Sequence, residues 1–147
     1  MRKAIVIVLT VLVAGCSMIQ SDDNEATKAA VAWGKAFFNC NFHEAEEYCT
    51  PESQRWLQFA ASNTTQHDLD LLARQGAAVE ATDYFPEATD TLRIVELRVS
   101  HALKPSAPGA EAQQVDEAFY HIIVVNRSGS WQVRMEGLPR SEKQSHD

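Results

Sequence analysis

The sequence lacks several features that would assign a function directly. Basic residues are outnumbered, with 13 Lys and Arg against 20 Asp and Glu, so the chain has no electrostatic reason to bind nucleic acid or an anionic lipid surface. The three cysteines lack the Cys-x-x-Cys spacing that is typical of redox-active thiols. No internal repeat is visible. No apolar run approaches the roughly 20 residues that cross a bilayer as a helix, and the 147 residues suffice for one globular domain.

The N-terminus carries the pattern of a bacterial export signal. Arg2 and Lys3 precede an apolar run over residues 4–14, and small residues then lead to Cys16. The run Leu-Val-Ala-Gly-Cys at 12–16 closely resembles the bacterial lipobox. This resemblance implies that residues 1–15 are removed as a signal peptide, that Cys16 receives a diacylglyceryl thioether, and that its new amine is open to acylation, for example by palmitate. The alternative is an ordinary secretory signal with an incidental cysteine.

Lipid on Cys16 would set the location of the protein. Two or more acyl chains hold a protein firmly on a membrane, whereas one chain holds it only marginally. Ser17, rather than Asp, follows the cysteine, which in enteric-type sorting favours the outer membrane over the inner one. We therefore expect a lipid-anchored protein of the cell envelope, on either face of its membrane, with residues 16–24 as lipidated cysteine and linker. Loss of Arg2 and Lys3 leaves 11 basic against 20 acidic residues, a net charge near -9.

The number of cysteines predicts a disulfide. With Cys16 lipidated, Cys40 and Cys49 remain as an even pair in an oxidising compartment. Nine residues of unbroken helix rise about 13.5 Å, but a disulfide needs α-carbons within about 7 Å. The chain must then turn between the two cysteines, and residues 39–41 are where it can. The bond would add about 2–3 kcal/mol. The alternative is two buried free thiols.

Hydrophobic spacing divides the chain into a helical half and a strand half. Apolar residues recur at helical intervals up to Gly76, and the period then changes to two. A domain over residues 25–138 with helices first and strands second is of the α+β class. A polar tail, 139–147, follows it. Helices are expected near 22–39, 42–49 and 50–62, and a further helical stretch over Leu69 to Ala73 stops at Gly76; strands are expected near 78–85, 92–103, 115–125 and 131–136.

This order of elements resembles the nuclear transport factor 2-like fold, a cone of helices packed on a curved antiparallel sheet of about four strands. The likeness rests on the turn Asn-Cys-Asn-Phe at 39–42, on Thr-Pro-Glu at 50–52 opening a helix, and on the final Ser-Gly-Ser-Trp at 128–131. Small uncharacterised bacterial lipoproteins have the same fold. The fold also hosts ketosteroid isomerases, polyketide cyclases and non-catalytic binding modules, so it does not decide the function.

Two histidines are the candidate polar residues of the cone interior. His101 is in phase with Val95, Leu97 and Val99, and His121 is in phase with other apolar residues of its strand. If both point inward they form a proton-transfer pair or two metal ligands; the alternative is a pair of hydrogen-bonded core or rim histidines. A zinc site needs three or four ligands, and no third occurs at ligand spacing, so no metal or cofactor is expected. Four aromatic residues, Trp33, Phe37, Trp56 and Phe59, are candidates for a ligand pocket or for plain core.

The expectation is therefore a non-enzymatic, lipid-anchored envelope domain with a binding or structural role and an unidentified protein or small-molecule partner. The rival expectation is an enzyme or small-molecule binder that uses the cone interior. Buried polar residues converging on an open cavity would favour the rival. A cone filled by Trp, Phe and Leu side chains would favour the interaction protein.

Replacing the attachment cysteine tests the anchor. The Cys16→Ser chain has no thiol for lipid, so we expect it to leave the membrane fraction on cell fractionation, whereas a Cys40→Ser control stays there. Mass spectrometry of the wild-type protein should find the lipid on Cys16. A Cys16→Ser protein that remains membrane-bound would show that lipid on this cysteine is not the anchor.

Overall fold

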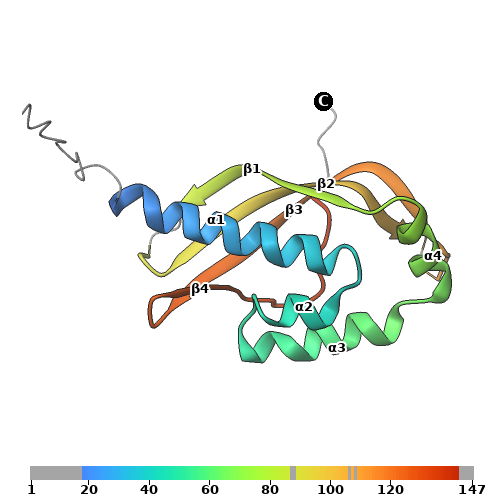
Figure 1. The fold of residues 1–147 in the computed structure, drawn as a ribbon, viewed down its shortest axis with the longest axis horizontal. Coiled ribbons are helices and arrows are strands. Elements are labelled where there is room, and N and C mark those ends of the chain that lie inside the picture. The colour runs from blue at the N-terminus through green and yellow to red at the C-terminus, as the bar shows by residue number, and fades with distance from the viewer. Residues whose placement is uncertain (1–17, 87–88, 106, 108, 143–147) are drawn as a thin grey trace, which may run out of the picture.

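The structure is a computed structural model that describes residues 18–86, 89–105, 107 and 109–142. The expected signal peptide, Cys16 and Ser17 lie outside these residues, as does the end of the expected tail. The expected order of helices followed by strands is confirmed (Figure 1). None of the described helices is both long and apolar enough to cross a membrane. The elements are α1 (Met18–Phe37), α2 (Phe42–Glu46), the 3-10 helix η1 (Pro51–Ser53), α3 (Gln54–Asn63), α4 (Gln66–Arg74), β1 (Ala78–Pro86), β2 (Leu92–Pro105), β3 (Ala112–Arg127) and β4 (Ser130–Val133).

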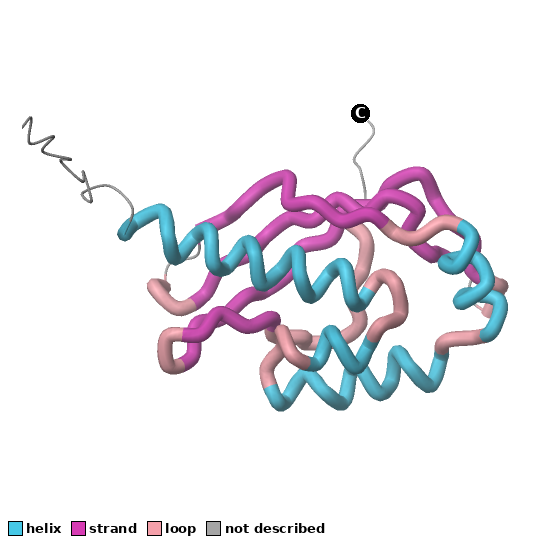
Figure 2. The backbone as a smooth tube through the Cα atoms, viewed as in Figure 1, coloured by secondary structure: helices cyan, strands magenta, loops and turns pink. Residues whose placement is uncertain are grey.

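The strands form one antiparallel sheet in sequence order, β1-β2-β3-β4. Figure 2 shows the strands as a single curved layer with α1 laid along it and with α2 and α3 beyond the end of β4. Contacts from α1 reach all four strands. The α+β class expected from the sequence is therefore confirmed, and one helix covers the inner face of the sheet.

The turn expected between the first two helices lies where α1 ends. Cys40 adopts the left-handed region, with φ of 60°. The Asn39 side-chain amide donates to Lys35 O at 2.8 Å and to Ala77 O at 3.0 Å, and its carbonyl accepts from Ala77 N at 2.9 Å. One asparagine thus satisfies a carbonyl of the helix end and joins it to the start of β1. At its other end α1 begins at Met18, inside the stretch expected to be a linker.

Helical spacing on α1 and alternation on the strands build the core. Ala26, Ala30 and Trp33 recur at intervals of three and four and are buried, as an amphipathic helix requires. On β2 the inward residues are Val95, Leu97 and Val99, and all three are fully buried. On β3 the inward residues are those with even numbers, Ala118, Tyr120, Ile122 and Val124.

The close approach of α1 to the sheet depends on a glycine. A β-carbon added at Gly34 would lie 2.8 Å from Leu97 Cδ1 and 3.0 Å from Val79 Cγ1. Leu97 is fully buried and Val79 is β-branched, so neither side chain moves aside at low cost. Gly34 is thus a packing residue, despite the weak helix propensity of glycine.

Gly34→Ala tests this packing. Overpacking costs about 1–3 kcal/mol, and replacing a helical glycine by alanine recovers up to about 1 kcal/mol. We expect a net loss of about 1 kcal/mol in the free energy of unfolding, measured by urea denaturation. The control is Gly137→Ala, where an added β-carbon meets nothing within 4 Å and the change stays within about 0.5 kcal/mol. Wild-type stability of Gly34→Ala would contradict the close approach.

Candidate functional site

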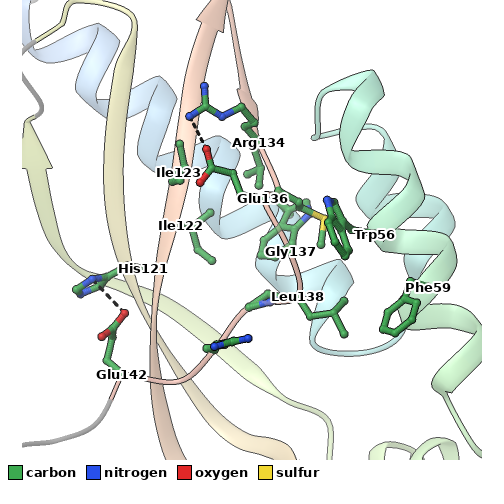
Figure 3. Close-up of a pocket in the computed structure, with 15 residues that line it drawn as sticks. Trp56, Phe59, His121, Ile122, Ile123, Arg134, Glu136, Gly137, Leu138 and Glu142 are labelled. Carbon is green, nitrogen blue, oxygen red and sulfur yellow. Dashed lines mark hydrogen bonds and ion pairs between the residues drawn. The ribbon is translucent and has the colours of Figure 1, made fainter.

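A cleft of about 710 Å³ opens between the edge of β3, helix α3 and the C-terminal segment 134–142 (Figure 3). We call this the edge cleft. Its walls come from α1, α3, β3, β4 and the C-terminal segment, and most are apolar. The lining residues used below are Trp33, Trp56, Phe59, His121, Ile122, Arg134, Met135, Glu136, Leu138, Arg140 and Glu142.

The edge cleft exists because the C-terminal segment leaves β3 and returns out of register. Arg134 N donates to Ile123 O at 2.9 Å, which continues the β3–β4 ladder. Because Val124 pairs with Val133, the same register would place Leu138 opposite Phe119. Instead Glu142 N, four residues further along, donates to Phe119 O at 2.8 Å. The surplus chain bows outward around Gly137 and Pro139, residue types that favour loops.

Buried hydrogen bonds fix the start of the C-terminal segment. Ser53 Oγ accepts from Met135 N at 2.9 Å and is bonded to Thr50 Oγ1 at 2.7 Å. Thr50 N donates to Val133 O at 2.9 Å, and Val133 N donates to Tyr48 O at 2.8 Å. Residues 48–50 thus pair with the end of β4, and the wall of the edge cleft is attached to the helical layer.

Aromatic side chains from two helices form the apolar side of the edge cleft. Trp33 of α1 is 1% exposed and stacks on Phe37 with ring centroids 4.7 Å apart. Trp56 and Phe59 project from α3 toward the segment that carries Gly137 and Leu138 (Figure 3). Of the four aromatic residues weighed for a pocket, Phe37 packs in the core, Phe59 lines the edge cleft, and Trp33 and Trp56 do both.

Charged residues lie at the rim. Arg134 Nη2 donates to Glu136 Oε1 at 2.9 Å, and His121 Nδ1 lies 3.4 Å from Glu142 Oε1 (Figure 3). His121 Nε2 also lies 3.0 Å from Glu96 Oε2, on the outer face of the sheet. Arg140, the remaining charged residue that lines the edge cleft, forms no ion pair with the described residues.

The structure does not bring the two histidines together inside the cone. Around Ile122 and Ile123, odd- and even-numbered residues of β3 are both apolar, so the sequence does not reveal which face of the strand is buried. In the structure the even-numbered residues from Ala118 to Val124 are buried, and His121 is exposed on the outer face. His101 has φ of 58°, and the alternation of β2 breaks there: Val99 is buried, and Ala102 is the next buried residue. The two histidines therefore do not form an interior pair.

The expected Cys40–Cys49 disulfide is absent from the structure, which has both as free cysteines. The two thiols face different neighbours. Cys49 Sγ donates to Glu46 O at 3.6 Å, whereas the Cys40 thiol lies near the Thr64 side chain. Burial raises the pKa of both thiols, that of Cys49 to about 11, which keeps them protonated and unreactive near neutral pH.

Apolar and aromatic packing fills the cone interior next to the edge cleft. Trp33, Leu97 and Val124 are fully buried, and the Tyr120 ring lies 4.6 Å from the ring of Phe38. Burial raises the pKa of the Tyr120 phenol, so it stays neutral. Within the described ranges, no three His, Cys, Asp or Glu side chains gather in a way that could hold a metal ion.

Comparison of the fold with solved structures identifies its type. The Mycobacterium tuberculosis protein Rv3472, described as of unknown function, matches with a TM-score of 0.51 and 13% identity, covering 89% of this chain and 78% of that one. The chain has the nuclear transport factor 2-like fold. A second structure, described as an Ntf2-like protein involved in plasmid conjugation, matches with a TM-score of 0.38 and 12% identity over 84% of this chain and 50% of that one.

No protein-family model and no curated protein sequence matches the chain. At 13% identity the likeness to Rv3472 concerns the fold alone. The function of this chain must therefore be argued from its own residues, and above all from the edge cleft.

Sequence reasoning missed the wall formed by the C-terminal segment. Residues 139–147 were expected to be a tail, but the backbone of Glu142 bonds to β3. Leu138 was the available signal, because a large apolar residue just past the expected last strand indicates chain that still packs. Pro139 and the polar residues after it concealed the return to the sheet.

Ser53→Ala tests the attachment of this wall. The substitution leaves the buried Met135 N–H without its acceptor, which costs about 1–3 kcal/mol of unfolding free energy. Urea denaturation measures the loss, and the Met135 amide should exchange its hydrogen faster. Ser62→Ala removes a comparable hydroxyl that donates to Phe59 O on the exposed side of α3, and should change stability by less than about 0.5 kcal/mol. Equal effects of the two substitutions would show that Ser53 does not hold the segment.

Proposed function

We propose that this protein is a lipid-anchored, non-catalytic envelope protein that binds a small, largely apolar molecule in the edge cleft. The observation that carries the proposal is the contrast between a cone interior filled by apolar side chains and a cleft of about 710 Å³ beside it. Ligand sites of about 300–1,000 Å³ with mostly apolar walls are typical of small-molecule binding.

Exposed apolar surface at the edge cleft supports binding. Phe59 and Leu138 are 51% and 37% exposed, and both line it. Large apolar side chains on a protein surface mark interaction sites when they cluster in a cleft rather than occur singly. A ligand that covers these two side chains would remove their apolar area from water at about 25 cal/mol per Å².

The polar chemistry of the interior supports a non-catalytic role. Among the described residues, the buried polar side chains outside the aromatic class are Thr50 and Ser53, and each already has a hydrogen-bond partner. Because the Ser53 hydroxyl oxygen already accepts from the Met135 backbone N–H, this hydroxyl pair serves as a structural contact rather than as an activated nucleophile.

The position of α1 supports the anchoring part of the proposal. The helix begins at Met18, two residues after the cysteine of the lipobox-like sequence. Lipid on Cys16 would therefore hold the domain close to the bilayer through a short connection. A ligand that partitions into or out of the membrane would be within reach of such a domain.

Proton transfer at the rim is the second candidate function, because one arrangement favours it. His121 lines the edge cleft and lies within 3.4 Å of the Glu142 carboxylate, a pairing that can orient an imidazole as a general base. The exposed position of this pair on the outer face makes it the weaker candidate, since catalytic proton transfer gains from exclusion of water.

Binding can be tested with the neutral dye Nile red and a charge placed in the wall. We expect the full chain carrying Cys16→Ser to bind the dye saturably. Adding Leu138→Asp should weaken binding at least tenfold, about 1.4 kcal/mol or more, because a carboxylate resists burial against an apolar ligand. Leu69→Asp is the matched control: Leu69 is 43% exposed on α4, outside the edge cleft, and its replacement should leave the affinity unchanged.

Equal losses in Leu138→Asp and Leu69→Asp would place the dye elsewhere, and no saturable binding would contradict the proposed function. A substrate turnover that His121→Gln abolishes, with ligand affinity retained, would favour the second candidate instead.

A further inference from the structure

The edge cleft interrupts a ladder of backbone hydrogen bonds. At one end Arg134 N donates to Ile123 O at 2.9 Å, and at the other end Glu142 N donates to Phe119 O at 2.8 Å. In an antiparallel sheet the N–H and C=O of one residue point to the same side of the strand, and this side alternates from residue to residue. His121 lies midway between Phe119 and Ile123 and has the same parity. Both of its backbone groups therefore point away from β2 and toward the C-terminal segment.

Three backbone groups of β3 on this side lack a partner among the described residues. Neither the His121 N–H nor the His121 C=O bonds to the C-terminal segment, and the Ile123 N–H does not bond back to Arg134. β4 ends at Val133, so no described strand covers this stretch of β3. His121 and Ile123 both line the edge cleft (Figure 3). One wall of the edge cleft is thus an open strand edge with two donors and one acceptor.

The surplus chain is long enough to leave room for another strand. The C-terminal segment takes eight residue steps from Arg134 to Glu142, whereas β3 takes four from Phe119 to Ile123. At about 3.4 Å a step, four steps cover about 14 Å and eight reach about 27 Å. A chain with that surplus can stand up to about 12 Å from β3 at its midpoint, and one inserted strand needs about 10 Å, two strand spacings.

We propose that the edge cleft binds a short extended peptide, which adds a strand between β3 and the C-terminal segment. This inference rests on the proposed binding function and specifies its ligand class. The peptide residue opposite His121 exchanges both backbone hydrogen bonds with it and turns its side chain to the outer face, as His121 does. The residues on either side point inward, as Ile122 does, toward the wall that contains Trp56 and Met135. The expected ligand therefore has apolar side chains at alternate positions.

An extended backbone fits these groups better than other apolar ligands do. A hydrocarbon would cover the apolar walls but leave the donors and the acceptor of β3 without a partner. A fatty acid or an alkylamine carries its polar atoms at one end only, whereas the strand edge presents N–H and C=O groups in succession. A peptide carries both kinds of group, and an extended chain repeats them at the spacing of the strand that it joins.

Methylated peptides test the pairing directly. The probe is the neutral, capped tripeptide acetyl-Leu-Thr-Leu-N-methylamide, whose two leucines point inward when its threonine lies opposite His121. A methyl group on the threonine nitrogen removes the hydrogen bond to the His121 C=O. A methyl group on the nitrogen of the second leucine is the matched control, because that N–H points away from β3. The protein is the full chain carrying Cys16→Ser, and binding is followed by NMR of its backbone amides.

The parent peptide should bind saturably, move the His121 and Ile123 amide proton signals downfield and slow hydrogen exchange at His121. The amides of β1, the other edge of the sheet, should not move. Methylation at threonine should weaken binding about tenfold, and methylation at the second leucine less than about threefold. The peptide acetyl-Thr-Leu-Thr-N-methylamide should also bind more weakly, because pairing with His121 would turn its single leucine outward.

The outcomes separate this inference from the function on which it rests. Equal weakening by the two methylations, or shifts in β1 as large as those at His121, would show that the peptide does not pair with β3. Saturable binding of Nile red without binding of the peptide would leave the edge cleft a ligand site and rule out a peptide as its ligand. Peptide binding that appears only after removal of residues 143–147 would assign the edge cleft to the chain's own end. If neither the dye nor the peptide binds, the proposed function itself fails.

Discussion

The packing of α1 across all four strands is the constraint on which the rest of the structure depends. Gly34 lets the helix axis approach Leu97 and Val79, and Trp33 beside it fills the space that remains. Because one helix covers the inner face, the sheet needs no second layer there. Helix α2 packs against α1, and α3 packs against α2 and forms one wall of the edge cleft. Because α1 fills the inner face of the sheet, the edge cleft lies at the edge of the sheet rather than over that face.

The edge cleft results from a competition between backbone pairing and side-chain packing. A fourth strand that continued in register would have paired with β3 along its length and closed the edge. The chain instead leaves the ladder after Arg134 and regains it at Glu142, with four surplus residues between. The Ser53–Met135 hydrogen bond holds one end of this detour, and the pairing of Glu142 with Phe119 holds the other. A loop fixed at both ends keeps a hollow open without a lid.

An anchored domain with a site of this kind suits ligands that are sparingly soluble. Lipid on Cys16 would keep the domain near a bilayer, and α1 begins almost at that cysteine. Mostly apolar walls match a molecule that is apolar along its body. The proposed anchor and the proposed ligand therefore belong to the same physical setting, the surface of a membrane.

The sequence by itself determined the order of helices and strands, the α+β class and the turn at Asn39 and Cys40, because periodicity and turn residues act locally. The sequence argument for that turn was an expected disulfide between Cys40 and Cys49. In the structure the turn is formed instead by the left-handed backbone of Cys40 and the hydrogen bonds of the Asn39 side chain. Only the tertiary structure decided which parity of β3 faces inward, since Ile122 and Ile123 are equally apolar. It also decided that His121 lies on the outer face of the sheet and that residues past the last strand complete the edge cleft. Each of these depends on pairing between distant segments, which local patterns do not encode.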